Sequence, residues 1–530
     1  MRSVSSHDVQ AMLADGDELA LVDVREELIF SQGHLLWARS IPLSRLELDF
    51  ARLVPRRSTR IVLCDDDDGL APRAWRILTQ AGYTDVAVLS GGIGAWAALG
   101  GELFSGVNVP SKAFGEFIEH ENATPSIGAG ELDALISRGA DLVVLDSRPL
   151  DEYRRISIPS ATSVPGAELV LRIRDLAPSP DTLVVVNCAG RTRSIIGAQS
   201  LINAGVPNKV VALRNGTMGF SLAGLTCEHD KDKRAPAPSR DGLAWALAAA
   251  ASVGRRFGVE RIDRATLTRW RAEADARTLY LFDVRDPDEY ARGHVAGAVS
   301  APGGQLVQAT DQYVGTLGAR IVLVDHAEVR ALMTASWLRQ MGWQDVFVLV
   351  ETGSERVKPE RAILGALAPG ERIIDCATLA GLLPRQEATV IDLSLSTNYR
   401  KAHIPGAWFA IRSQLERALG KIPLRGTLML TSEDGVLASL AVAEASALTT
   451  HTVRCLKGGN AMWQASGYAT STQVQMADDP IDVWVKPYER GSDAHGAMRD
   501  YLAWEIDLLE RVRRDSSCRF STAPVPIAMV

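Results

Sequence analysis

The sequence contains no run of 18 apolar residues, and its first residues, Met1 to Asp8, lack the apolar core of a signal peptide. Because a transmembrane helix needs about 20 apolar residues, we expect no membrane span. Histidine is scarce, with 9 residues, and the 6 cysteines are scattered singly without a CxxC pair. We therefore expect no zinc site or other metal, no disulfide framework, no cofactor, and a reducing cytoplasmic location.

An excess of positive charge is also lacking, since 57 Lys and Arg stand against 64 Asp and Glu and give a net charge of −7. Nucleic-acid binding needs clustered positive charge, so it is not expected. A chain of 530 residues is too long for one hydrophobic core. We expect roughly three to five domains.

The most informative stretch is an apolar run, residues 184–186, followed by Asn187 and Cys188. The loop 189–193 and a helical pattern from Ser194 come next. This order predicts a strand, an anion-binding loop and a helix whose N-cap is Ser194. Loop N–H groups, the positive helix end and the two loop arginines would lower the thiol pKa from about 8.5 towards neutrality. The pattern therefore favours a reactive thiolate at Cys188 over a small buried core residue.

Four copies of one unit run along the chain. Each opens with a short apolar strand that ends in aspartate, at Asp23, Asp146, Asp283 and Asp392. Eleven residues after these aspartates stand His34, Ser157, His294 and His403. Fifteen residues after them stand Ala38, Ala161, Ala298 and Ala407. These fixed offsets show that the chain is a tandem repeat.

A second apolar strand follows in each copy, and the loop position just after it holds Asp65, Cys188, Asp325 or Ser432. That position lies 42 residues beyond the strand-end aspartate in the first three copies and 40 beyond it in the fourth. Each copy closes with a glycine-containing turn, at residues 90–92, 214–216, 351–353 and 457–459. Trp96 and Trp463, which follow two of these turns, are expected to anchor the core.

The alternation of strands and helices predicts an α/β fold of four tandem domains, each with a mainly parallel central sheet covered by helices on both faces. In such folds the ligand lies at the carboxyl ends of the strands, where position 188 falls. The predicted domains span residues 5–100, 126–228, 260–355 and 372–470. Residues 478–530 are predicted to form a C-terminal helical extension.

Two segments between the copies are predicted linkers, residues 101–126 and the charged, proline-containing residues 229–239, which divide the chain into two halves. The alanine-rich stretch 243–253 is predicted to be a core or interdomain helix. In the tail, an apolar stripe at helical spacing should dock on a domain, and a homodimer through that stripe is the alternative. The stripe consists of Leu502, Ile506, Leu509 and Val512.

The repeated motifs resemble the rhodanese-domain family. The likeness rests on the Asp-Val-Arg-Glu strand end, the Gly-His pairs at 33–34 and 293–294, the Cys-Ala-Gly-Arg-Thr-Arg loop and the closing Gly-Gly-x-x-x-Trp, and it spans about residues 5–470. It implies a sulfurtransferase whose loop cysteine attacks thiosulfate or a low-molecular-weight persulfide. The cysteine then keeps the outer sulfur as a persulfide and passes it to a thiol or cyanide.

Mapped onto this sequence, the resemblance makes Cys188 the catalytic nucleophile and persulfide carrier. Arg148, two residues after the strand-end aspartate, is expected either to face the pocket or to form a structural salt bridge. No residue of this copy suggests a dedicated general acid or base. The substrate-binding loop supplies a cradle of N–H groups and two arginines for the anionic donor, and it consists of Ala189, Gly190, Arg191, Thr192, Arg193 and Ser194.

The other three copies depart from the family pattern, because Asp65, Asp325 and Ser432 replace the loop cysteine. These copies are predicted to be non-catalytic. Cys64, one residue before the first loop, is predicted to be a core thiol. In the copy that keeps the cysteine, residues 156–157 are Ile-Ser instead of Gly-His. The Gly-His pair is expected to be structural, so its loss is not expected to inactivate the site.

Two other functions stay open from the sequence. Cysteine phosphatases use a Cys-x5-Arg loop preceded by His, whereas Cys188 and Arg193 give Cys-x4-Arg preceded by Asn187. A partner-dependent sulfur-relay scaffold is favoured by the three copies that lack the loop cysteine. Mercaptopyruvate is the less favoured donor, because the enzymes that use it carry a Gly-Ser-Gly-Val-Thr type of loop after the cysteine.

Overall fold

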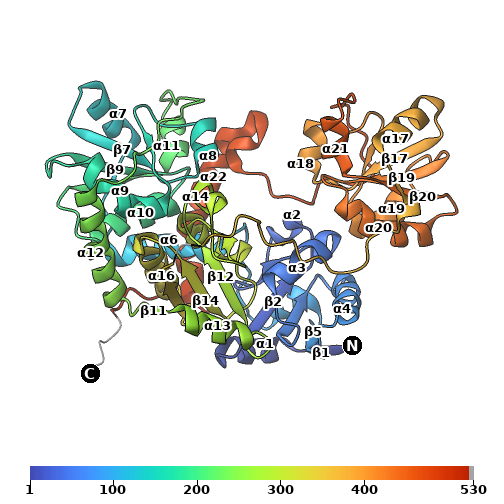
Figure 1. Ribbon diagram of the computed structural model, residues 1–530, viewed down its shortest axis with the longest axis horizontal. Coiled ribbons are helices and arrows are strands. Elements are labelled where there is room, and N and C mark those ends of the chain that lie inside the picture. The colour runs from blue at the N-terminus through green and yellow to red at the C-terminus, as the bar shows by residue number, and fades with distance from the viewer. Residues whose placement is uncertain (352, 525–530) are drawn as a thin grey trace.

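The computed structural model describes residues 1–351 and 353–524, and each repeat forms its own five-stranded sheet (Figure 1). The four sheets share one strand order, which in the first repeat is β1-β5-β4-β2-β3, and their strands pair in parallel. The predicted fold of four tandem α/β units is confirmed. We refer to the units as domains 1 to 4. Thr352, in the third predicted closing turn, and residues 525–530 of the predicted extension lie outside the described residues.

The elements of the four domains follow the same succession. Domain 1 contains β1 (Arg2–Val4), α1 (Ser6–Ala14), β2 (Leu19–Asp23), α2 (Glu27–Phe30), β3 (Arg39–Ser40), α3 (Leu46–Leu53), β4 (Arg60–Cys64), α4 (Leu70–Gln80), β5 (Val86–Leu89) and α5 (Gly92–Ala98). Domain 2 contains β6 (Ser126–Ile127), α7 (Ala129–Ser137), β7 (Leu142–Asp146), α8 (Leu150–Arg155), β8 (Thr162–Ser163), η2 (Gly166–Glu168), α9 (Leu169–Leu176), β9 (Leu183–Asn187), α10 (Thr192–Asn203), β10 (Val210–Leu213) and α11 (Gly216–Leu222).

Domains 3 and 4 repeat this pattern. Domain 3 contains β11 (Glu260–Ile262), α13 (Arg264–Ala272), β12 (Leu279–Asp283), α14 (Pro287–Arg292), β13 (Val299–Ser300), α15 (Gly303–Gln308), β14 (Arg320–Val324), α16 (Val329–Gln340) and β15 (Val346–Leu349). Domain 4 contains β16 (Ile373–Ile374), α17 (Cys376–Leu382), β17 (Ala388–Asp392), α18 (Ser396–Lys401), β18 (Trp408–Phe409), α19 (Leu415–Leu419), β19 (Thr427–Thr431), α20 (Val436–Leu448), β20 (Val453–Leu456) and α21 (Gly459–Ala465).

Strand β9, which carries the Cys188 loop, is the middle strand of its sheet. Its residues Val184, Val185 and Val186 are fully buried, as expected for a parallel strand covered on both faces. Branched side chains pack well on such a surface and favour the extended backbone. The strand therefore gives the loop after Asn187 a rigid base. Trp96 and Trp463 are also buried, in agreement with their predicted role as core anchors.

The first predicted linker has structure of its own. Residues 101–126 include the helix α6 (Val109–Asn122), which packs against α10 and against the last helix of the chain. Eight of its residues are buried, so it belongs to the structure around the Cys188 loop. The composition of this segment did not indicate that role.

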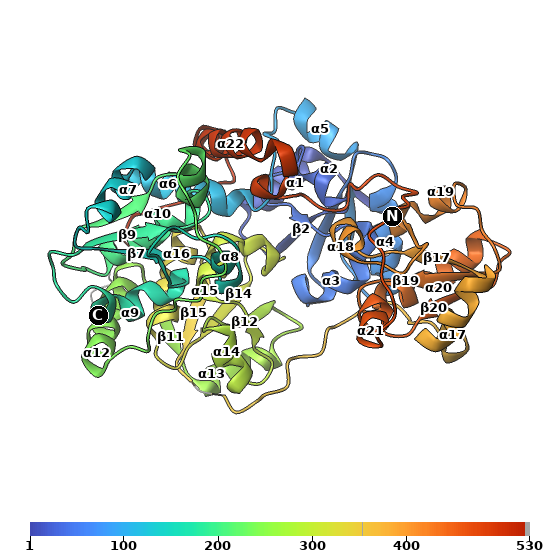
Figure 2. The same ribbon diagram turned by 90° about the horizontal axis from the view of Figure 1, so that it is seen from above.

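The second predicted linker does not divide the chain into separate halves. It leads into α12 (Arg240–Arg256), the interdomain helix predicted at residues 243–253, which packs on α9 of domain 2 and α16 of domain 3. One hydrophobic cluster runs through both domains and includes Val186, Leu323 and Trp337. Figure 2 shows domains 2 and 3 together at one end, domain 1 in the middle and domain 4 at the other end.

After domain 4 the chain crosses back to domain 2 and forms α22 (Ala494–Arg514) (Figure 1). The helix packs on α6 of the same chain, as the docking prediction requires. Its buried residues differ from the predicted stripe, because Ile506 is 50% exposed. The inward face consists of Ala497, Met498, Leu502, Glu505, Leu508 and Val512. A buried glutamate therefore interrupts the apolar stripe, and hydrophobicity alone did not find this face.

Within residues 1–351 and 353–524, no helix combines the length and the apolar character that a bilayer crossing requires.

Candidate active site

Cys188 follows the last residue of β9 and lies at the carboxyl end of the sheet, where parallel α/β folds bind ligands. It is 2% exposed, and its Sγ lies 3.5 Å from Ser194 Oγ. The helix α10 begins at Thr192 with Arg191 as N-cap, two residues before the predicted start. Ser194 is thus inside the first turn, where its hydroxyl donates to the Arg191 carbonyl at 2.8 Å and faces the thiol.

The loop after Cys188 forms a cradle of N–H groups. Within the described residues, no acceptor is assigned to the backbone N–H groups of residues 189–194. They lead into the N-terminus of α10, whose dipole adds partial positive charge. Successive N–H groups in this arrangement form an anion-binding concavity. The geometry therefore suits a thiolate, a persulfide or an anionic donor.

The loop is held from behind by the start of α11. The N–H groups of Thr217 and Met218 donate to the carbonyls of Cys188 and Ala189 at 2.8 and 2.9 Å. Gly216 has φ +54°, and a Cβ there would lie 2.3 Å from the Cys188 carbonyl oxygen. The predicted closing turn therefore needs glycine for two reasons, backbone conformation and close approach.

In the other three domains, the residue that replaces Cys188 fills the equivalent cradle. The Asp65 carboxylate accepts from the N–H of Ala71 at 2.8 Å, and the Asp325 carboxylate accepts from the N–H of Arg330 at 2.9 Å. Ser432 Oγ accepts from the N–H of a residue on α20 at 3.2 Å. Two of the three replacements are acidic side chains, which shows that this loop geometry stabilises negative charge.

Arg148 forms a buried ion pair at the start of the domain. It donates to Asp146 at 2.9 Å and to the Ile156 carbonyl at 2.6 Å, and it is 2% exposed. Arg25 and Arg285 make the same bonds in domains 1 and 3, which lack the loop cysteine. Of the two expectations for Arg148, the structure shows the structural salt bridge.

Arg191, predicted to bind the anionic donor, is instead enclosed by acidic residues of α6. Its guanidinium donates to both oxygens of Glu116 at 2.7 Å and also contacts Glu119. A further bond reaches Asn215 at 3.2 Å. The side chain is 8% exposed. Arg191 therefore fastens the loop to α6, and its charge is balanced by carboxylates that the sequence motif could not reveal.

Arg193 has fewer carboxylate partners than Arg191. It donates to Glu152 at 2.8 Å and to Gln305 of domain 3 at 3.0 Å. Burial would raise the pKa of Glu152, but Arg193 outweighs it and brings that pKa to about 2, so the carboxylate is ionised. Burial would lower the pKa of Arg193, but Glu152 outweighs it and raises that pKa above its usual value, so the guanidinium is positively charged.

The C-terminal helix covers this loop with residues that sequence reasoning missed. Glu505, 1% exposed, accepts from the Tyr501 hydroxyl at 3.0 Å and from the Thr192 hydroxyl at 3.3 Å. Lys112 of α6 lies 3.4 Å from the same carboxylate oxygen. Burial, Glu505 and Cys188 together raise the pKa of Tyr501 well above its usual value. The sequence offers one signal for this contact, which is the acidic Glu505 among the apolar residues on the inward face of α22.

The Gly-His histidines are structural, as predicted. His34 is buried and stacks on Phe30 with ring centroids 3.8 Å apart. His294 stacks on Tyr290 at 3.9 Å. At the equivalent position of domain 2, Ser157 forms a backbone bridge with Glu228, as the histidines do with their own partners. Because that bridge is backbone only, Ser157 preserves the local structure.

Cys64 is fully buried in the core of domain 1. Burial and the neighbouring Asp23 raise the pKa of its thiol well above the usual value. It is a core residue, as predicted, and differs sharply from Cys188 in its surroundings.

Comparisons with known proteins agree with this geometry. A family profile described as "Rhodanese-like domain" matches residues 5–99, 128–223 and 265–357. The crystal structure of a thiosulfate sulfurtransferase from Pseudomonas aeruginosa is 49% identical, with a TM-score of 0.95, and the match covers 99% of this chain and 100% of that one. A thiosulfate sulfurtransferase of Azotobacter vinelandii is 27% identical over 228 residues, which are 35% of this chain and 82% of that protein.

Proposed function

This chain belongs to the rhodanese-like domain family and is a sulfurtransferase, and on that premise we propose that it carries sulfane sulfur as a persulfide on Cys188. The donor is thiosulfate or a low-molecular-weight persulfide, and the acceptor is a thiol or cyanide. Both steps displace sulfur from sulfur and need a stabilised anion rather than a general base.

One observation carries the proposal. Of the four equivalent loops, only that of domain 2 holds a thiol, and its N–H groups at 189–194 have no acceptor among the described residues. In domains 1, 3 and 4 the cradle is occupied by Asp65, Asp325 and Ser432. The Cys188 loop is thus the one that can receive an external or sulfur-bound anion.

The proposed reaction proceeds in two balanced steps. The Cys188 thiolate attacks the outer sulfur of thiosulfate, the S–S bond breaks, and sulfite leaves with the electron pair. The acceptor thiolate or cyanide then attacks the outer sulfur of the Cys188 persulfide, and Cys188 leaves as thiolate. The N–H groups of residues 189–194 and Arg193 stabilise the negative charge in both steps.

Intact-protein mass spectrometry after incubation with thiosulfate tests the proposal. The wild type should gain the mass of one sulfur atom and lose it on addition of cyanide. Cys188→Ser should gain none. Sulfur uptake by Cys188→Ser at the wild-type rate would refute the assignment of the nucleophile.

The burial of Cys188 beneath α22 favours a second candidate, a sulfur relay in which a protein partner delivers the persulfide. In that case thiosulfate alone would load Cys188 slowly, and a persulfidated partner protein would load it quickly. Rapid loading by thiosulfate alone would exclude this second candidate.

A further inference from the structure

Domains 2 and 3 face each other so that one arginine of each reaches the other domain. Arg193 and Arg330 stand five residues after the loop positions Cys188 and Asp325. Arg193 donates to Gln305 of domain 3 at 3.0 Å, and Arg330 donates to Glu168 of domain 2 at 2.9 Å. Gln305 and Glu168 both stand 22 residues after the strand-end aspartates of their domains. The two contacts are therefore equivalent by pseudo-twofold symmetry.

The two equivalent contacts differ in charge. Arg330 is surrounded by three carboxylates, with Asp325 and Glu168 both at 2.9 Å and Glu289 also in contact. Arg193 pairs with one carboxylate, that of Glu152, at 2.8 Å. Its cross-domain partner is the uncharged Gln305. Both guanidiniums keep their positive charge, but one carboxylate compensates that of Arg193, whereas three compensate that of Arg330.

We propose that Gln305, supplied by the cysteine-free domain 3, is a positioning residue for sulfur transfer: it holds Arg193 beside Cys188 without neutralising it, and so favours an anionic donor. The inference rests on the proposed function of Cys188 and gives domain 3 a role in it. A carboxylate at position 305 would lower the positive potential that attracts thiosulfate.

The packing between the two domains fixes Gln305 in place. A Cβ on Gly303, at the start of α15, would lie 3.0 Å from the Ala167 Cβ of domain 2, and a Cβ on Gly304 would lie 3.0 Å from the Gly166 nitrogen. The helix therefore lies in direct contact with η2 of domain 2 and cannot slide without a clash.

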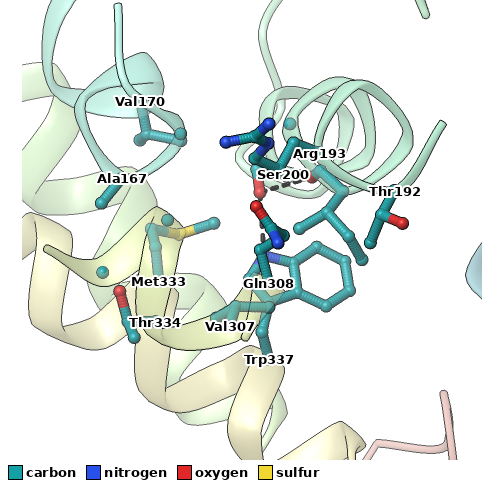
Figure 3. A pocket seen from close by; sticks show the side chains of 15 residues that line it. Ala167, Val170, Thr192, Arg193, Ser200, Val307, Gln308, Met333, Thr334 and Trp337 are labelled. Carbon is teal, nitrogen blue, oxygen red and sulfur yellow. Dashed lines mark hydrogen bonds between the residues drawn. The ribbon is translucent and has the colours of Figure 1, made fainter. Parts of the chain in front are cut away.

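A small cavity of about 30 Å³ lies in the same interface and is lined by residues of both domains, among them Arg193 (Figure 3). At its base, Trp337 Nε1 of domain 3 donates to Ser200 Oγ of domain 2 at 2.8 Å. This hydrogen bond joins α16 to α10, the helix that carries Arg193. Two hydrogen bonds therefore fix the position of domain 3 relative to α10, one at Arg193 and the other at Ser200.

The other charged and titratable groups around Arg193 come from domain 2 and the tail. They are Glu152, Arg148, Cys188, Tyr488 and Tyr501, with Lys486 lying 3.6 Å from Glu152. A substitution at position 305 leaves all of these side chains in place. Its effect therefore reports on the contact between Arg193 and position 305.

The test compares Gln305→Glu with Gln312→Glu, which adds the same charge on an exposed residue of domain 3. Gln305→Glu should raise KM for thiosulfate about tenfold with a smaller change in kcat, since an added charge near the site costs about 1 kcal/mol or more. It should also move the pH of half-maximal Cys188 alkylation by iodoacetamide upwards. Gln312→Glu should match the wild type in both measurements.

Intact mass at saturating thiosulfate separates this inference from the proposed function. If Cys188 still gains one sulfur but KM and the alkylation profile of Gln305→Glu equal those of Gln312→Glu, the role of Gln305 is refuted. If no sulfur is gained even by the wild type, the proposed function itself fails. Should Gln305→Glu not fold, Gln305→Leu removes the hydrogen bond without adding charge. An unchanged KM for thiosulfate in that variant would equally refute the inference.

Discussion

The hydroxyl of Thr192 donates to Glu505 at 3.3 Å, so the first residue of α10 is tied to α22. The same carboxylate oxygen accepts from Tyr501 and lies 3.4 Å from Lys112 of α6. Segments from three parts of the chain thus meet over the Cys188 loop. The consequences for stability and reactivity can be measured.

Glu505→Ala should destabilise the protein and loosen the cover over Cys188. The variant leaves Lys112 and the Thr192 hydroxyl without their buried partner, which costs about 1–3 kcal/mol in the free energy of unfolding. Denaturant unfolding measures that loss, and Cys188 should be alkylated faster at constant pH. Glu510→Ala, on the same helix but with a side chain 71% exposed, is the control and should change neither quantity. Equal alkylation rates in the two variants would contradict a covering role for α22.

Gly216→Ala should impair sulfur transfer through the backbone of the loop. The added Cβ would lie 2.3 Å from the Cys188 carbonyl oxygen, so the loop must move to accept it. We expect a fall in kcat/KM for thiosulfate of about tenfold or more, because small misplacements of a reacting group are costly. Gly224→Ala is the matched control, since it also has positive φ but nothing within 4 Å. It should lose about 1 kcal/mol of stability and keep its activity. A kcat/KM for Gly216→Ala equal to that of this control would show that the loop tolerates the change.

Cys64→Ala should keep full sulfur transfer and lose stability. Burial raises the pKa of this thiol, so it is protonated and unreactive at neutral pH. Removing a small buried side chain costs about 1 kcal/mol. Intact mass spectrometry after thiosulfate should still show one added sulfur. Failure to load would indicate that Cys64 takes part in the reaction.

Asp65→Ala should destabilise domain 1 by about 1–3 kcal/mol, because the N–H groups of Asp67 and Ala71 lose their buried acceptor. The change lies in domain 1 and Cys188 in domain 2, so sulfur loading of Cys188 should be unaffected. Thermal or denaturant unfolding provides the measurement, with Asp151→Ala, whose side chain is 96% exposed, as the control. Stability equal to that of the control would mean that the carboxylate adds nothing to the cradle of domain 1.

The contact between domains 1 and 4 should depend on pH through Glu26. Burial raises the pKa of this carboxyl to about 7, although Ser413 of domain 4 and Ser44 both donate to it. A raised acid pKa means that the folded state binds more protons than the unfolded state between about pH 4.3 and 7. Protonated Glu26 therefore contributes to the free energy of unfolding below that range, and this contribution is lost as the pH rises to 7.

Glu26→Gln, a neutral mimic, isolates this effect. From pH 4.5 to 7 the wild type should lose about 2–4 kcal/mol in the free energy of unfolding relative to the variant. Above pH 7 the difference between the two proteins should stay constant. A difference that is independent of pH would show that Glu26 titrates alike in both states.

The repeat, the sheets and the strand, loop and helix around Cys188 could be predicted from sequence because each depends on local spacing. Apolar strands ending in aspartate and the offset to position 188 recur with little variation. The partners of the loop could not be predicted in this way. Glu116 pairs with Arg191 across 75 residues and Glu505 pairs with Thr192 across 313, and no local pattern records such contacts. The motif therefore indicated two free arginines, whereas the folded chain pairs Arg191 with two carboxylates and Arg193 with one.

The position of α22 also bears on how the protein is made. A ribosome synthesises Cys188 first and must add more than 300 further residues before Glu505 can reach the loop. At ordinary translation speeds this takes roughly 15–60 s. During that time the nascent chain carries its thiol without the final cover. The cover over Cys188 therefore forms late in synthesis, and a product cut short before Glu505 would present the cysteine to the surrounding medium.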